Sequence, residues 1–273
     1  MGIFRAARAL VVTAGRGQAV TTVSRSLVVF SIGVLLAAAA RPASAQEPPA
    51  DTDILQEYRI TGYPSYRISD EVSGFGYVGW VYKPDARYTS YYLGKGVFWT
   101  PKKWLQVWGG VIGVYTNQYD SSNLLEIRPF GGPKFMGMNS RKWQVYNWTR
   151  YEMRLTETLN TDEWTTVHRF RNQTRLSIPL ASPARAWKPK TAILFSDIEP
   201  IYRSDKDNVD PVRLRVGLGY IASPQLLVEF QYFAQWTRPG GGGLKYTDNI
   251  WRLNFKLSGR GGIERLLYGG MDE

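Results

Sequence analysis

The segment from Pro211 to Arg238 limits most narrowly what this chain can fold into, because its side chains alternate with the two-residue period of a β-strand. The break Ala222-Ser223-Pro224 divides it into two halves, and each half has one apolar face and one polar or charged face. This pattern predicts an antiparallel hairpin. The apolar face also carries Tyr220, Tyr232 and Trp236. Because such rings favour the boundary between lipid and water, the pattern is typical of a membrane-spanning β-barrel.

The N-terminal region predicts export. Arginines precede an apolar run from Leu27 to Ala40, and the small residues Ala43-Ser44-Ala45 follow that run. This order is typical of a secretory signal peptide, so we expect residues 1–45 to be cleaved off. The apolar run is shorter than the roughly 18 to 20 residues that a membrane-spanning helix needs. Export followed by β-strands predicts a location in the bacterial outer membrane, with a periplasmic β-sandwich as the alternative.

Composition is consistent with a barrel. The mean hydropathy is −0.29, although the chain contains 10 Trp, 17 Tyr and 11 Phe. Polar lumen residues lower the mean hydropathy of a barrel while its outer face stays apolar. The signal region holds five of the 34 basic residues and none of the 23 acidic ones, so the mature chain keeps a charge of +6. No Lys/Arg-rich run or zinc-ligand pattern accompanies this charge, and we predict no nucleic-acid partner.

We predict a single folded domain, an all-β, closed antiparallel transmembrane β-barrel of about ten strands. Residues 46–55 are predicted to be a flexible periplasmic tail, residues 56–258 the barrel, and residues 259–273 a C-terminal periplasmic extension. The strands are expected at residues 74–82, 88–100, 104–118, 123–134, 143–158, 164–180, 190–203, 211–221, 225–237 and 246–257.

The count of ten depends on a parity argument. Single-chain bacterial barrels have even strand numbers, with short turns in the periplasm and longer loops outside. The tight Ala222-Ser223-Pro224 turn is therefore placed in the periplasm. The extended segment 56–69 contains Pro64, which interrupts a strand ladder, and including this segment would make eleven strands. Twelve strands is the alternative, with an additional strand within residues 261–268.

Several short motifs carry a resemblance to a known family. They are Pro64-Ser65-Tyr66-Arg67, Gly74-Phe75-Gly76-Tyr77, Leu125-Glu126-Ile127-Arg128-Pro129-Phe130, Arg150-Tyr151-Glu152, Asp197-Ile198-Glu199-Pro200 and Asp248-Asn249-Ile250-Trp251-Arg252-Leu253. In this order the chain resembles exported bacterial outer-membrane barrel proteins of unknown function, of the type called domain of unknown function 2490, over roughly residues 58–257. The resemblance implies a fold and an outer-membrane location, and it implies no catalytic residues.

Charged residues of the predicted strands share the polar faces, and a charge facing lipid near the midplane costs about 2–4 kcal/mol for Arg or Lys. We therefore predict that they point into the lumen as a charge network or anion path. This set is Glu126, Arg128, Arg150, Glu152, Arg154, Arg169, Arg171, Arg175, Asp197, Glu199, Arg203, Arg213, Arg215, Glu229, Arg252 and Lys256. Tyr220, Tyr232, Trp236 and Trp251 are predicted to be membrane-interface aromatics.

Two functions fit this lumen. Eleven bases against five acids would give a narrow pore with positive potential that passes small anionic solutes. Alternatively, the charges pair with one another, and the barrel is closed by salt bridges and has a structural, adhesive or assembly role. The expected partners are outer-membrane lipid and the barrel-assembly machinery, with small anionic solutes added in the case of a pore.

No enzyme is predicted. The single histidine, His168, is opposite in phase to Arg169 and therefore faces outward, and no serine or acid lies at a recognisable catalytic spacing from it. Asp197 and Glu199 share one face and are candidates for acid/base work or cation binding, but the nearby arginines favour salt bridges. We predict no cofactor and no metal site.

Overall fold

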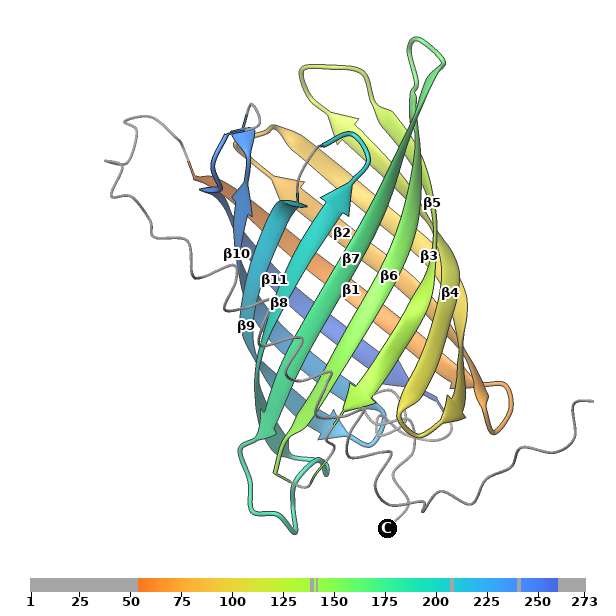
Figure 1. Ribbon diagram of the computed structural model, residues 1–273, viewed down its shortest axis with the longest axis vertical. Coiled ribbons are helices and arrows are strands. Elements are labelled where there is room, and N and C mark those ends of the chain that lie inside the picture. The colour runs from red at the N-terminus through yellow and green to blue at the C-terminus, as the bar shows by residue number, and fades with distance from the viewer. Residues whose placement is uncertain (1–53, 138–139, 141, 207–208, 240–241, 260–273) are drawn as a thin grey trace, which may run out of the picture. The chain divides into compact units, whose positions relative to one another are not determined.

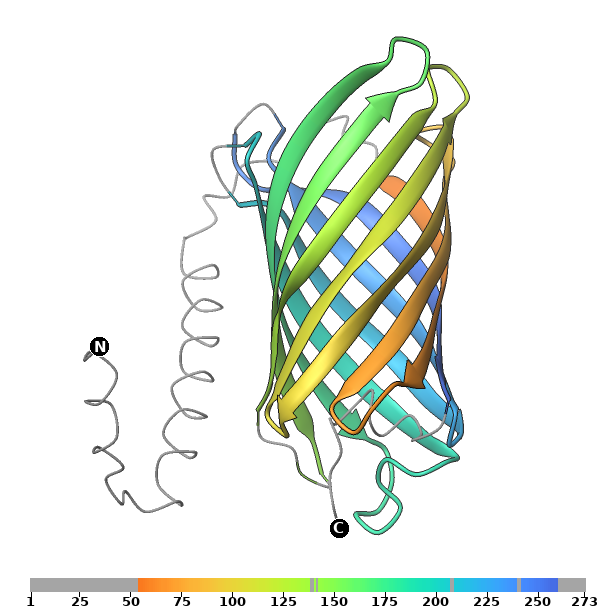
Figure 2. The same ribbon diagram turned by 90° about the vertical axis from the view of Figure 1, so that its right-hand side faces the viewer.

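The computed structural model describes residues 54–137, 140, 142–206, 209–239 and 242–259. Within this part of the chain, eleven strands form one closed, strongly tilted β-barrel (Figures 1 and 2). The strands are β1 (Leu55–Arg67), β2 (Val72–Lys83), β3 (Tyr88–Lys102), β4 (Leu105–Gln118), β5 (Leu124–Gly137), β6 (Gln144–Thr158), β7 (Glu163–Pro179), β8 (Thr191–Arg203), β9 (Val209–Ser223), β10 (Leu226–Thr237) and β11 (Lys245–Ser258). No helix among the described residues has the length and apolar character needed to cross a membrane.

The ten predicted strands correspond to β2–β11, and the predicted hairpin is the antiparallel pair of β9 and β10. The barrel has eleven strands, between the predicted ten and the alternative of twelve, because the segment that was left outside the ladder is β1. It lies between β2 and β11 and pairs with β11 in parallel, from Leu55 opposite Asp248 to Ser65 opposite Ser258. The barrel is therefore mixed, with one parallel seam in an otherwise antiparallel sheet.

Pro64 was the reason for excluding β1, and the structure shows why this proline is tolerated. It keeps its place in the parallel pairing with β11, opposite Leu257. On the β2 side, the pairing is interrupted between Gly62 and Ser65, and the proline ring lies against Gly76. A side chain at Gly76 would begin only 3.0 Å from that ring, so this glycine makes room for it.

Because the number of strands is odd, the first strand begins at one rim of the barrel and the last strand ends at the opposite rim. We call the rim where β1 begins the entry rim, and the rim where β1 ends the cap rim, which is the lower one in Figure 1. Leu55 lies at the entry rim and Ser258 at the cap rim. The prediction of periplasmic tails at both ends rested on even parity, and it stays a prediction. Residues 1–53, with the predicted signal peptide, and residues 260–273, with the alternative additional strand, lie outside the described residues.

Side chains alternate between the lumen and the outer face, as the two-residue period predicts. On β9, for example, Leu214, Val216, Leu218 and Tyr220 are exposed, whereas Arg215 and Ile221 are buried. Exposed large apolar side chains of this kind occur on all eleven strands. The outer surface of the barrel is therefore an apolar sheet, and the polar groups are concentrated inside.

Two apolar clusters fill part of the lumen. The first joins Phe75, Phe98, Trp108 and Phe130 from β2–β5, with the rings of Phe98 and Trp108 stacked at 4.5 Å between centroids. Gly96 makes this packing possible, because a Cβ there would lie 2.6 Å from the Phe75 ring.

The second cluster lies near the cap rim, beside the ends of β8, β9 and β10. Ala186 and Trp187, from the connection between β7 and β8, are buried against Ile193, Ile221 and Leu227. The Trp187 indole N–H donates to the carbonyl oxygen of Ser140 at 3.2 Å, which ties this connection to the one between β5 and β6. These contacts hold the connection between β7 and β8 against the strand ends at this rim.

Candidate functional site: the charged lumen

Charged side chains line the lumen along its whole length. Thirteen basic residues face inward on the described strands: Arg59, Lys83, Arg128, Lys134, Arg150, Arg154, Arg169, Arg171, Arg175, Arg213, Arg215, Arg252 and Lys256. Seven acidic residues share this space: Glu57, Glu126, Glu152, Asp197, Glu199, Glu229 and Asp248. The predicted set lies here with one exception, and the surplus of six positive charges matches the surplus expected from the sequence.

The exception is Arg203. It lies at the entry-rim end of β8 and donates two hydrogen bonds to Asp205, of 2.6 and 2.9 Å, in the connection that follows. Both side chains are partly exposed. Arg203 is therefore a rim residue and not part of the lumen network, because its strand ends where its guanidinium can reach water.

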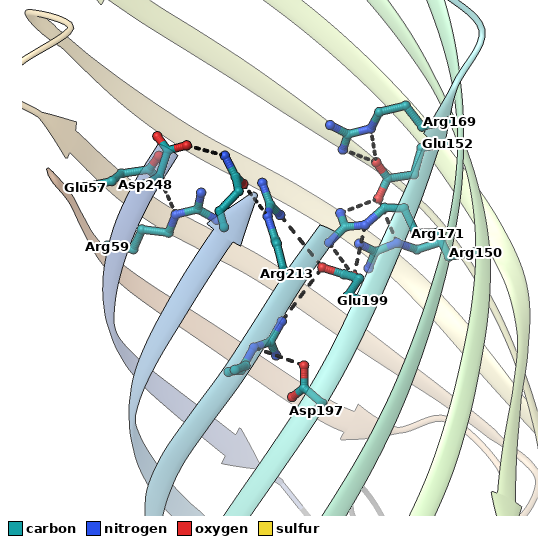
Figure 3. A network of polar contacts seen from close by, with 12 residues as sticks. Glu57, Arg59, Arg150, Glu152, Arg169, Arg171, Asp197, Glu199, Arg213 and Asp248 are labelled. Atoms are coloured by element: carbon teal, nitrogen blue, oxygen red, sulfur yellow. Dashed lines mark hydrogen bonds and ion pairs between the residues drawn. The ribbon is translucent and has the colours of Figure 1, made fainter. Parts of the chain in front are cut away.

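Glu152 on β6 is paired closely with three arginines. It accepts hydrogen bonds from Arg169 and Arg171 on β7, at 3.0 Å from Arg169 Nε and 2.9 Å from Arg171 Nη1. Arg150, two residues earlier on its own strand, lies 2.7 Å away (Figure 3). The Glu152 side chain is only 3% exposed. Three guanidinium groups thus surround one buried carboxylate.

Glu199 on β8 continues this network toward β9. Arg171 donates to it at 2.6 Å and so bridges Glu152 and Glu199. The guanidinium groups of Arg213 and Arg215 lie farther away, at 3.8 and 3.9 Å. Beside Glu199, Asp197 has only Arg215 within ion-pair distance among the described residues, at 3.4 Å. This part of the lumen therefore holds longer, looser contacts than the part around Glu152.

Glu229 on β10 organises the lumen nearer the cap rim. One of its oxygens accepts from Arg175 at 2.7 Å and from Lys256 at 2.9 Å. The other accepts from the side-chain amides of Gln231 at 2.7 Å and Asn254 at 2.8 Å. All these partners are supplied by β7, β10 and β11, so this carboxylate joins three strands.

A further group lies on β5 and β6, where Glu126 accepts hydrogen bonds from Arg128 at 2.5 Å and from Arg154. The Arg128 guanidinium also lies 5.9 Å from the ring centroid of Tyr92 on β3. These contacts connect β3, β5 and β6 across the lumen.

Near the entry rim, the structure adds residues that the sequence interpretation missed. Glu57 and Arg59 of β1 pair with each other, and Asp248 of β11 pairs with Lys83 of β2. Glu57 and Arg59 were overlooked because β1 was not counted as a strand. The signal was present in the sequence, since they alternate with Tyr58 and Ile60, which are exposed on the outer face.

Gln235 of β10 joins this group to the middle of the lumen. It donates to Asp248 at 2.6 Å and accepts from Arg213 at 2.6 Å. Arg213 in turn faces Glu199, so polar contacts continue from Asp248 to Glu152 across six neighbouring strands (Figure 3). The sequence pattern identified the members of this network, but the order of the contacts comes from the strand register.

The four predicted interface aromatics lie on the outer face, but two depart from the expected rim position. Tyr220 lies near the cap-rim end of β9, and Trp236 lies near the entry-rim end of β10. Tyr232 and Trp251 are opposite each other halfway along β10 and β11, with ring centroids 4.8 Å apart. The hydroxyl of Tyr232 is satisfied locally, because it donates to Asn249 at 2.6 Å, so this ring tolerates a mid-strand position.

His168 lies on the outer face of β7, and its Nδ1 shares a hydrogen bond of 2.6 Å with the hydroxyl of Tyr151. Among the described residues, no group of three or more His, Asp or Glu side chains is arranged to hold a metal ion. Asp197 and Glu199, the candidates for acid/base work, both face Arg215. The arrangement therefore favours ion pairs between these carboxylates and the lumen arginines.

Sequence comparisons are consistent with this picture. No curated protein matches the chain at a significant level. A family model, described as "Protein of unknown function (DUF2490)", matches residues 50–244, which extend from just before β1 to the connection between β10 and β11. This match covers well over half of the sequence, and the chain therefore belongs to the family of unknown function DUF2490.

Proposed function

We propose that this protein is an outer-membrane β-barrel whose lumen is packed closed, and that it serves as a structural, adhesive or assembly component of that membrane. The observation that carries the proposal is the burial of Glu152 among Arg150, Arg169 and Arg171. A buried carboxylate with three guanidinium partners is a packed structural element, because solvated charges along a water-filled pore would remain exposed. The apolar cluster of Ala186 and Trp187 near the cap rim also supports a closed lumen.

The outer face supports the location. Large apolar side chains are exposed on every strand, and a soluble protein rarely exposes so continuous an apolar surface. Closure by the seam of β1 and β11 satisfies the backbone hydrogen bonds of both strands, as the lipid phase requires. The proposed partners are accordingly outer-membrane lipid and the barrel-assembly machinery.

A narrow anion pore is the second candidate, because the lumen holds thirteen bases and seven acids. The long contacts of 3.4 to 3.9 Å around Asp197 and Glu199 leave room for water between the charges. In this alternative, the surplus cations would give the lumen a positive potential that attracts small anions.

Conductance of the purified, refolded protein in planar bilayers distinguishes the two functions, with Arg171→Gln as the informative variant. A closed barrel gives no channel steps, and Arg171→Gln loses much of its stability because two carboxylates lose a partner. Steady anion-selective conductance in the wild type, with reduced selectivity but normal stability in Arg171→Gln, would support the pore and overturn the closed barrel.

Location and topology are tested together by single-cysteine labelling, since the natural chain has no cysteine. Gln56→Cys lies at the entry rim and Ser258→Cys at the cap rim. In intact cells, an impermeant maleimide should label Gln56→Cys and not Ser258→Cys. Short turns of bacterial barrels face the periplasm, so we assign the cap rim, with its tight turn between β9 and β10, to that side. Equal labelling of both positions, or recovery of the protein in the soluble fraction, would contradict a spanning barrel.

A further inference from the structure

Lys134 on β5 is a buried cation without a counter-ion. Its side chain points into the lumen, and the residue is 7% exposed. Among the described residues, no carboxylate lies within ion-pair distance of it. It lies over the faces of two rings, with Nζ 4.3 Å from the centroid of Tyr146 and 5.8 Å from that of Trp108. Ring faces attract an ammonium group, but they accept few of its hydrogen bonds.

The charged groups around Lys134 do not neutralise its positive charge. Its electrostatic neighbours are Lys256, Arg175 and Glu229. Glu229 is the only acid of the three, and both of its oxygens already accept hydrogen bonds from Arg175, Lys256, Gln231 and Asn254. The neighbourhood of Lys134 thus carries three cations and one fully occupied carboxylate, which leaves it with a net positive charge.

Two more unused donors lie directly beside Lys134. The strand register places Gln106 of β4 opposite Lys134 on one side and Trp148 of β6 opposite it on the other. Gln106 Nε2 and Trp148 Nε1 are both buried and have no hydrogen-bond partner in the part of the chain that the structure describes. Gln106 Oε1 accepts from the Trp108 indole at 3.2 Å, and this contact leaves the amide nitrogen as the free end of the side chain.

Three donor residues on three adjacent strands therefore lie next to one another in one cross-strand row, and their donors lack an acceptor among the described residues. Burying a donor without a partner costs about 1–3 kcal/mol, so an acceptor bound at this row would stabilise the folded protein. One water molecule accepts at most two hydrogen bonds, whereas a carboxylate or phosphate offers at least four lone pairs and a negative charge.

We propose that Gln106, Lys134 and Trp148 form a binding site for a small oxyanion, a carboxylate or phosphate, held inside the lumen between β4, β5 and β6. Lys134 supplies the charge, and the amide and indole N–H groups orient the ligand. The inference concerns a fixed site and is independent of whether the lumen conducts.

The test uses the full mature chain, refolded from urea into detergent in the presence of inorganic phosphate or acetate. A bulky sulfonate salt keeps the ionic strength constant, and the readout is the midpoint of thermal unfolding against ligand concentration. The wild type should show a saturable rise in the midpoint. Lys134→Met should bind at least tenfold more weakly, whereas Lys95→Met, which removes an exposed lysine of β3, should behave like the wild type.

Trp148→Phe provides a second variant in case Lys134→Met fails to fold, because it removes the indole N–H and keeps a smaller aromatic ring. It should weaken binding several-fold. A stronger response to acetate than to phosphate would identify the ligand as a carboxylate, and the reverse order would identify it as phosphate. No saturable response of the wild type to either anion, or an unchanged response in both lumen variants, would overturn the site, whatever the conductance measurement shows.

Discussion

Glu152 and Asp197 are both buried carboxylates on the lumen face, yet they are held very differently. Glu152 is in contact with three guanidinium groups, and two of them donate hydrogen bonds to it. Asp197 has one guanidinium, that of Arg215, at 3.4 Å, and neither of its oxygens accepts a hydrogen bond within the described structure. Burial alone therefore does not indicate how strongly a lumen charge is bound.

The difference follows from where the arginines lie. The register places Arg169 opposite Glu152, and Arg150 and Arg171 flank the pair. Asp197 lies opposite Arg175 and Arg215. However, Arg175 turns to Glu229 at 2.7 Å, and the guanidiniums of Arg175 and Arg215 stack on the rings of Phe195 and Phe233. Competing partners thus leave Asp197 loosely held.

The strongest test of this comparison is Glu152→Gln. The substitution keeps the shape of the side chain but removes the charge that offsets three buried guanidiniums. Breaking a buried ion pair by removing one partner costs about 3–5 kcal/mol, so we expect a loss of this order in the free energy of unfolding. Urea unfolding of the barrel in detergent, followed by tryptophan fluorescence, measures it. A loss below about 1 kcal/mol would show that the arginines are solvated, which is the pore alternative.

Asp197→Asn is the matched substitution at the loosely held position. We expect the free energy of unfolding to change by about 1 kcal/mol or less, since a contact of 3.4 Å without a hydrogen bond contributes little. The same urea experiment applies. If Asp197→Asn destabilised the protein as much as Glu152→Gln, the distinction between tight and loose pairing would be wrong.

The pair of Arg203 and Asp205 at the entry rim is the water-exposed reference. The hydrogen bonds from Arg203 lower the pKa of Asp205 below its ordinary value. A lowered pKa stabilises the folded state above the unfolded pKa, and this contribution is lost as the pH falls below about 4. Exposed pairs contribute about 0.2–1 kcal/mol, so Asp205→Asn should change stability only slightly at pH 7.

The pH dependence gives the sharper measurement for this pair. The small difference between the wild type and Asp205→Asn should be constant between about pH 5 and 8 and should disappear toward pH 3. A difference that grew on acidification would have the wrong sign for a carboxylate with a lowered pKa, and it would contradict the proposed effect of Arg203 on Asp205.

Much of the barrel was predictable because strand alternation is a local property. Ten strands, the hairpin of β9 and β10 and fifteen of the sixteen predicted lumen charges follow from the two-residue period alone. Arg203 has the correct phase but lies at the end of its strand, and periodicity does not show where a strand leaves the lumen. β1 was missed because Pro64 and an even-number rule outweighed a clear alternation at Glu57 and Arg59.

The sequence by itself determined which side chains face the lumen and which face outward, because neighbouring residues of a strand point to opposite sides of the sheet. Only the tertiary structure decided that β1 closes the barrel against β11 in parallel, since that seam joins segments almost 200 residues apart. The pairing of Glu152, the looseness of Asp197 and the lack of an acid beside Lys134 depend on the register between strands. Register is set by the closure of the whole sheet, and for that reason no single strand carries it in its sequence.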